Sequence, residues 1–219
     1  MNGSGAIKTV AIVDDDVKAQ ESESLAVQDA GFIATIITGP LGTLSDFLHS
    51  SAVDHDALLF DYKLSQGPYA SFDGAEAVAS LYGKLPCLLC TMWSPAMLDS
   101  MRPYRSRIPV LIPSDSLDGN AVLSGLEICL QESRGNFLPN RVPTQAIVRI
   151  EDVDRDQKPG IVYAVVPGWN HKEVVRFPIT IIPGNLQPHV KVGERFLAKV
   201  NLGADDQSQL YFEDFEYRS

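Results

Sequence analysis

Acidic side chains stand directly after two of the short apolar runs in this 219-residue chain. Asp14, Asp15 and Asp16 follow the first run, Asp61 follows a later one, and the hydroxyl residue Thr91 follows another. If these runs are neighbouring parallel strands, their carboxyl ends open onto one crevice and bring these side chains together. Carboxylates that are held close together repel one another, so such a pocket requires a cation. Because its ligands are oxygen atoms, the pocket favours Mg²⁺.

The elements that must position these residues alternate regularly between Lys8 and Glu132. Short apolar runs suit strands covered on both faces, and the polar stretches between them suit helices. In the first helix, Leu25, Ala26 and Ala30 are expected on one side. Five such units in order predict an α/β fold with a doubly wound five-stranded parallel sheet. The expected strands are residues 9–13, 32–38, 57–60, 85–90 and 108–112, and the expected helices are residues 17–30, 43–50, 75–82, 95–101 and 120–131.

The sequence changes character after residue 132. Residues 133–144 contain Gly, Pro and Asn without periodicity, and we interpret them as a linker between a first domain (1–132) and a second (145–219). The second domain shows only strands separated by turn residues, which predicts a small all-β, barrel-like domain. Its strands are expected at residues 145–150, 161–166, 174–177, 195–200 and 209–215.

An ordered set of short motifs in residues 8–132 resembles the receiver domain of two-component response regulators. The resemblance implies a flavodoxin-like fold and a signalling role, with a sensor histidine kinase or another signalling protein as partner. The motifs are Val13-Asp14-Asp15-Asp16, Gly31-Phe32, Leu59-Phe60-Asp61, Asp73-Gly74 and Leu88-Leu89-Cys90-Thr91.

The resemblance also implies roles for individual residues. Asp61 would be the phosphoacceptor of a phosphorelay, and Thr91 would hydrogen-bond a phosphoryl oxygen. Asp14, Asp15 and Asp61 would hold Mg²⁺ together with the backbone carbonyl of Lys63. Positioning and metal electrostatics accomplish nearly all of phosphoryl transfer. We therefore expect a phosphoprotein with no enzymatic turnover of its own.

The sequence departs from the receiver pattern at three positions. Ile112 stands before Pro113, where receivers have a lysine that pairs with the phosphoryl group. Pro109 stands where receivers usually have an aromatic switch residue. The bulky Met92 follows Thr91, where receivers normally have a small residue. Lys63 is a hypothetical substitute cation. Two alternatives therefore stand: a working phosphoacceptor, or a phosphorylation-independent pseudo-receiver that acts as a scaffold or dimerises.

Composition and charge exclude several other classes. With 45% hydrophobic and 21% charged residues, the chain is typical of a soluble globular protein. It has no apolar run long enough for a membrane-spanning helix and no secretory signal at its N-terminus. Three cysteines do not suggest a disulfide framework, and Cys87 and Cys90 are expected to be buried strand residues. We expect a cytoplasmic protein.

The uneven charge bears on nucleic-acid binding. Residues 1–132 contain 7 Lys and Arg against 17 Asp and Glu, whereas residues 133–219 contain 11 of each. The second domain is rich in aromatic residues, but a barrel that binds single strands also needs a cationic groove. Nucleic-acid binding is the least favoured alternative, and Trp169 and His171 are better candidates for a protein contact. The leading hypothesis is a response-regulator-like protein whose receiver domain controls or presents a β-barrel interaction module.

Overall fold

The computed structural model describes residues 6–92 and 97–217, which fall into two compact units. The first unit contains residues 6–92 and 107–136, and the second contains residues 97–106 and 137–217. The boundary expected from the sequence assigns residues 97–106 to the first domain. In the structure these residues lie in the second unit, although they come between two strands of the first.

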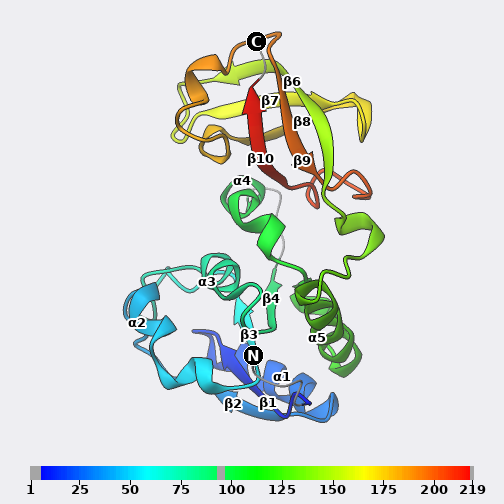
Figure 1. Cartoon of the computed structure of the whole chain (residues 1–219). Coiled ribbons are helices and arrows are strands. Elements are labelled where there is room, and N and C mark those ends of the chain that lie inside the picture. The colour runs from blue at the N-terminus through cyan, green and yellow to red at the C-terminus, as the bar shows by residue number, and fades with distance from the viewer. Residues whose placement is uncertain (1–5, 93–96, 218–219) are drawn as a thin grey trace. The chain divides into compact units, whose positions relative to one another are not determined.

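The first unit is built on a parallel sheet (Figure 1). Its strands are ordered β2-β1-β3-β4-β5, and every neighbouring pair is parallel. This order defines the flavodoxin-like type of doubly wound sheet, which confirms the fold predicted for residues 8–132. The strands are β1 (Thr9–Val13), β2 (Ile33–Ile36), β3 (Ala57–Asp61), β4 (Cys87–Thr91) and β5 (Leu111–Pro113).

Helices cover the two faces of this sheet. One buried core joins α1 and α5 to alternate residues of β1, β3, β4 and β5. On the other face Phe47 of α2 packs edge-on against Phe60 of β3, with ring centroids 5.6 Å apart. The helical elements are α1 (Val17–Asp29), α2 (Leu44–Leu48), η1 (Ser51–Asp54), α3 (Gly74–Leu81), η4 (Ser114–Ser116) and α5 (Gly119–Ser133).

The face that α1 buries differs from the prediction. Leu25, expected on one side of the helix with Ala26 and Ala30, is 62% exposed, while Glu23 is only 3% exposed. Ala26 and Val27 are buried as well. Residues 23, 26, 27 and 30 share one helix face because they are spaced by three or four positions. Because this face packs against the sheet, Leu25 points away from the core and is exposed although it is hydrophobic.

The second unit contains an antiparallel sheet in the order β10-β9-β6-β7-β8. The rings of Phe177 on β8 and Phe212 on β10 lie 4.7 Å apart, so the two ends of the sheet curl toward each other around a common core. This geometry agrees with the expected barrel-like all-β domain. The elements are η5 (Pro139–Arg141), β6 (Thr144–Asp154), β7 (Ile161–Val166), β8 (Asn170–Pro178), η6 (Ile179–Ile181), η7 (Gln187–His189), β9 (Arg195–Val200) and β10 (Phe212–Tyr217).

Residues 97–106 are bound into the second unit by buried arginines. This stretch, called the crossover segment below, contains α4 (Leu98–Met101) and most of η3 (Arg102–Arg107). Arg102 donates from Nη1 to the carbonyl of Leu210 at 2.8 Å, and Arg141 donates from Nη2 to the carbonyl of Ser106 at 2.9 Å. Of the helix expected at residues 95–101, the structure contains α4 from Leu98 onward. The first two residues of the expected range, 95 and 96, lie outside the described residues.

Two side chains proposed for contacts have different surroundings. Trp169 is partly buried against the core of the second unit and donates from Nε1 to the carbonyl of Ala204 at 2.8 Å. Trp169 thus packs partly against this core, while His171 is exposed, and a protein contact at either residue stays a prediction. Cys87 and Cys90 are buried free thiols, as expected. In the described part of the chain, no helix is long and apolar enough to cross a membrane.

Candidate functional site

The strand register brings the predicted site residues to one edge of the parallel sheet. Val13 pairs with Phe60, so Asp14 and Asp61 leave β1 and β3 side by side. Asp61 in turn pairs with Cys90, next to Thr91 at the end of β4. The structure therefore places Asp14, Asp61 and Thr91 at one edge of the sheet, with Asp14 and Thr91 both buried.

Asp14 is the buried carboxyl group at this edge of the sheet. Its Oδ1 accepts a hydrogen bond from the backbone N–H of Asp16 at 2.6 Å. Burial, opposed by that hydrogen bond and assisted by the charges of Asp61 and Asp15, raises the pKa of Asp14 to about 6. Asp16 has a different task, since its carboxylate caps α1 by accepting from the backbone N–H groups of Lys18 and Ala19. Asp15 is exposed at the rim.

Asp61 is half-buried and turned toward the loop that follows β3. Its Oδ2 accepts from the backbone N–H of Lys63 at 2.6 Å. Burial raises the pKa of Asp61, hydrogen bonds from Lys63 and Tyr62 lower it, and the charges of Asp15 and Asp73 raise it again. The two charges named here, those of Asp15 and Asp73, are both negative.

Lys63, considered as a substitute for the missing receiver lysine, is engaged elsewhere. Its Nζ lies 3.5 Å from Asp73 Oδ2 and 4.7 Å from the centre of the Tyr62 ring. Asp73 also accepts from the hydroxyl of Ser65 at 2.7 Å. The position of the missing lysine is occupied by Ile112, which is buried in the core beside Cys90. Neither position presents a cation to Asp61.

Gly74 explains why the Asp73-Gly74 motif belongs to the site. A Cβ atom on Gly74 would lie 2.0 Å from the backbone carbonyl oxygen of Asp61, closer than any real contact. Gly74 also donates its N–H to the carbonyl of Tyr62 at 3.0 Å. The start of α3 can therefore approach the end of β3 only because this residue has no side chain.

Glu23 is a site residue that the sequence reasoning missed. Its buried carboxyl group shares a side-chain hydrogen bond with Asp14 and is influenced by the charge of Asp61. Burial, followed by these two neighbours, raises the pKa of Glu23 to about 8. The signal that could have revealed it is spacing, because Glu23 stands three and four residues before the buried Ala26 and Val27.

The donor set suits a hard divalent cation. Asp14, Glu23 and Asp61 offer carboxylate oxygens, and Oε2 of Glu23 is buried without a hydrogen-bond partner. Among the described residues, no group of three or more His, Cys, Asp or Glu side chains is arranged so that it could hold a metal ion. The acidic side chains at this edge are of the type that a divalent cation prefers, but in this structure they do not converge on one point. The ligand set Asp14, Asp15, Asp61 and the Lys63 carbonyl stays a prediction.

Comparisons with known proteins identify similar folds. No protein-family model matches the sequence, and no curated protein matches it. Among solved structures, the signal receiver domain of an HD domain-containing protein from Pseudomonas fluorescens Pf-5 is 13% identical, covers 62% of this chain and 95% of its own, and has a TM-score of 0.44. The N-terminal domain of a response regulator/sensory box/GGDEF three-domain protein from Carboxydothermus hydrogenoformans is 18% identical over 59% of this chain and 98% of its own, with a TM-score of 0.43.

A CheY-like response regulator receiver domain protein from Methanospirillum hungatei JF-1 is also 18% identical over 59% of this chain and 98% of its own, with a TM-score of 0.42. At these identities and TM-scores we base no conclusion on the similarity. The strand order and the motif order of the chain itself define its first unit as a receiver-like, flavodoxin-type fold.

Proposed function

We propose that the protein is a response-regulator-like signalling protein that acts through protein contacts, without phosphorylation of Asp61 as an obligatory step. The ordered receiver motifs and the strand order support the signalling class. The charge around Asp61 favours the pseudo-receiver over the phosphoacceptor alternative, and this observation carries the proposal.

A phosphoryl group on Asp61 would add negative charge to a pocket that already holds Asp14 and Glu23. Receivers offset that charge with a lysine, but Ile112 stands there and Lys63 pairs with Asp73. Mg²⁺ alone would have to neutralise all of these groups. The pocket is therefore better suited to binding a cation than to stabilising a phosphoryl group.

The crossover segment supports a role in which the receiver-like unit presents the β unit to a partner. The segment begins shortly after Thr91 in the chain, yet its contacts lie in the second unit. Asp99 of α4 pairs with Arg176 of β8 at 2.5 Å. The partner we propose is another signalling protein, such as a sensor kinase, or a second copy of this chain.

Intact mass spectrometry after incubation with acetyl phosphate and Mg²⁺ tests the proposal. We expect the native protein to remain largely unmodified, and Ile112→Lys to gain one phosphoryl group, because the substitution restores a cation beside the pocket. Asp61→Asn in the Ile112→Lys background should abolish the gain. Near-complete modification of the native protein that Asp61→Asn removes would overturn the proposal.

A further inference from the structure

The first unit contains a cavity at the edge of the parallel sheet opposite to its acidic edge. The cavity lies between the end of α3, the start of β4 and the last turns of α5, and its volume is about 120 Å³. All the residues that line it belong to the first unit. Cys87, which lines the cavity, begins β4, and Thr91 ends it, so about 13 Å of strand separates the cavity from the acidic edge.

The buried residues that line this cavity are apolar. Val78, Cys87 and Cys129 are between 1% and 5% exposed, and Pro86 and Leu130 beside them are half-buried. The thiol of Cys129 donates its proton to the carbonyl of Cys87 at 3.3 Å, and buried cysteines behave as small hydrophobic residues. A cavity with such walls holds water poorly and takes an apolar group instead.

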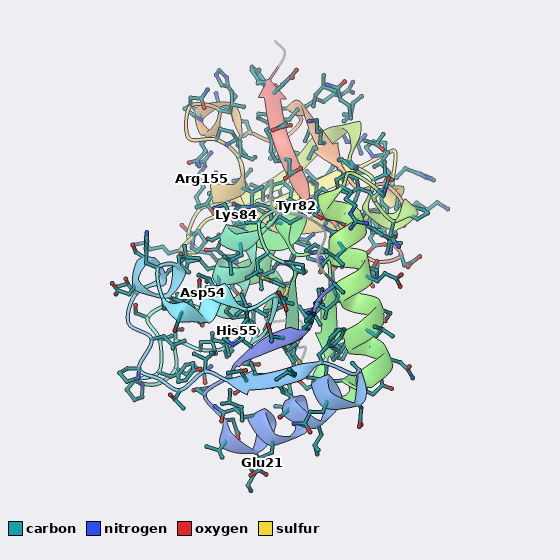
Figure 2. All side chains as sticks on the ribbon, turned by 60° about the horizontal axis from the view of Figure 1, so that its bottom comes forward. Glu21, Asp54, His55, Tyr82, Lys84 and Arg155 are labelled. Carbon is teal, nitrogen blue, oxygen red and sulfur yellow. The ribbon has the colours of Figure 1, made fainter. Side chains whose placement is uncertain are left out.

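Two cationic side chains stand at the exposed rim of the cavity. Lys84 follows Tyr82 in the turn after α3, where Figure 2 labels both residues, and Arg107 comes shortly before β5. In the described part of the chain, neither Lys84 nor Arg107 takes part in an ion pair. The ammonium group of Lys84 makes a long hydrogen bond to the carbonyl of Ser80, at 3.4 Å. Both cations are therefore able to pair with an anion.

The rim is positive although the sequence around it is strongly acidic. Residues 1–132 contain 17 Asp and Glu against 7 Lys and Arg, yet none of the described residues that line the cavity is acidic. The carboxyl group of Glu132 accepts a hydrogen bond from the hydroxyl of Tyr82 at 3.1 Å without lining the cavity. At physiological ionic strength, charges farther away than about 8 Å are largely screened, so the two rim cations dominate the local field.

We infer that this cavity binds a small aromatic carboxylate of about the size of benzoate. An apolar cavity of about 150 Å³ accommodates benzene, so a cavity of about 120 Å³ with an open rim has room for one such ring. The ring would lie against the apolar wall, and the carboxylate would pair with Lys84 and Arg107, whose guanidinium fork matches two carboxylate oxygens. The inference goes beyond the proposed function, because it gives the receiver-like unit an input that does not involve Asp61.

Calorimetric titration of the full chain with benzoate, benzyl alcohol and benzylamine tests the site. The three probes share the ring and differ in charge, so we expect benzoate to bind at least about tenfold more tightly than benzyl alcohol, and benzylamine to produce no measurable heat. Arg107→Gln and Lys84→Gln should each weaken benzoate binding by about threefold or more. Lys18→Gln is the matched control, because Lys18 is exposed at the start of α1, and it should change the affinity by less than about twofold.

Cys129→Leu tests the apolar part of the site by filling the cavity. This variant should bind benzoate at least about tenfold more weakly and melt at no lower temperature than the native protein. Asp61→Asn should bind benzoate as the native protein does, which separates this site from the acidic edge. Equal affinities for benzoate and benzyl alcohol, or unchanged benzoate binding in folded Cys129→Leu, would overturn the inference. If Cys129→Leu does not fold, unchanged binding in Arg107→Gln and Lys84→Gln would overturn it, as would the absence of benzoate binding by the native protein.

Discussion

Burial determines whether an acidic side chain between the end of β1 and the middle of α1 caps a helix or has a raised pKa. Asp16, at the exposed start of α1, acts as a helix cap. Asp14 and Glu23, only a few residues away, are buried against each other, and burial is the largest cause of the raised pKa of each. Similar residue types in one short stretch thus perform two physical tasks, and exposure decides between them.

The raised pKa values predict that the protein loses stability as pH rises. Glu23 has a pKa of about 8 in the folded protein and an ordinary value of 4.5, so the folded state binds more protons between these values. In that window the free energy of unfolding should fall by up to about 1.4 kcal/mol per pH unit from this group. The loss is absent below the lower value and complete above the upper one.

Urea unfolding at about pH 5 and about pH 8, with a chelator present, measures this effect. Glu23→Gln should remove most of the pH dependence, while Glu21→Gln should leave it as in the native protein. Asp14, whose folded pKa is about 6, should account for part of what remains. An identical pH dependence in the native protein and Glu23→Gln would show that Glu23 is not the titrating group.

The close approach of α3 to β3 is the element-level contact on which the pocket depends. Alanine normally stabilises a helix relative to glycine by about 1 kcal/mol. At Gly74 the sign should reverse, because the new Cβ would collide with the carbonyl of Asp61 and force the two elements apart. We expect Gly74→Ala to lower stability by about 1–3 kcal/mol and to weaken cation binding.

Gly184 is a matched control for this substitution. A Cβ atom there would meet nothing within 4 Å, and its φ is not positive. Differential scanning calorimetry of both variants measures the difference. Gly184→Ala should leave the midpoint of thermal unfolding almost unchanged, whereas Gly74→Ala should lower it. A Gly74→Ala protein that is as stable as Gly184→Ala would mean that α3 does not rest against the end of β3 as described.

Most strands of the first unit could be predicted because each is a short apolar run with a polar stop. Asp14, Asp61 and Thr91 could be placed for the same reason, since residues that end parallel strands share one edge. The buried face of α1 could not be predicted, because Leu25 is exposed and Glu23 is buried, and only packing against the sheet fixes the helix rotation. The strand expected at 209–215 begins later, at Phe212, because Leu210 and Tyr211 are used to bind the crossover segment and the stretch before β6.

The crossover segment could not be predicted either. Its arginines look like surface residues in the sequence, yet Arg102 is buried and bonds to the carbonyl of Leu210, which is 108 residues away. Long-range contacts of this kind leave no local periodicity. A single boundary at residue 132 therefore assigns this segment to the first domain, whereas the structure assigns it to the second unit.

At the scale of the whole molecule, Arg141 is the anchor that holds the crossover segment. It is buried, donates to the carbonyl of Ser106 at 2.9 Å and lies 5.4 Å from the centre of the Tyr211 ring. Arg141→Met keeps the apolar stem but leaves that carbonyl without its donor, so we expect a loss of about 1–3 kcal/mol. Protease cleavage within residues 97–106 should become faster.

Arg149→Met is a matched control for the stability loss expected of Arg141→Met. It pairs with Glu151 at a partly exposed site, where an ion pair contributes about 0–1 kcal/mol. Arg149→Met should therefore unfold at nearly the native urea concentration and keep the native cleavage rate. If Arg141→Met behaves in the same way as Arg149→Met, the crossover segment is not held by Arg141.

The central claim is that the acidic pocket binds a cation while a phosphoryl group on Asp61 has little effect on the molecule. Adding beryllofluoride, a phosphoryl mimic, to the Mg²⁺-loaded protein tests it most directly, with hydrogen exchange in residues 97–106 and light scattering as readouts. We predict that beryllofluoride changes the exchange rates by less than about fivefold beyond Mg²⁺ alone and leaves the oligomeric state unchanged. A switch from monomer to dimer, or a larger change in exchange that Asp61→Asn abolishes, would contradict the claim.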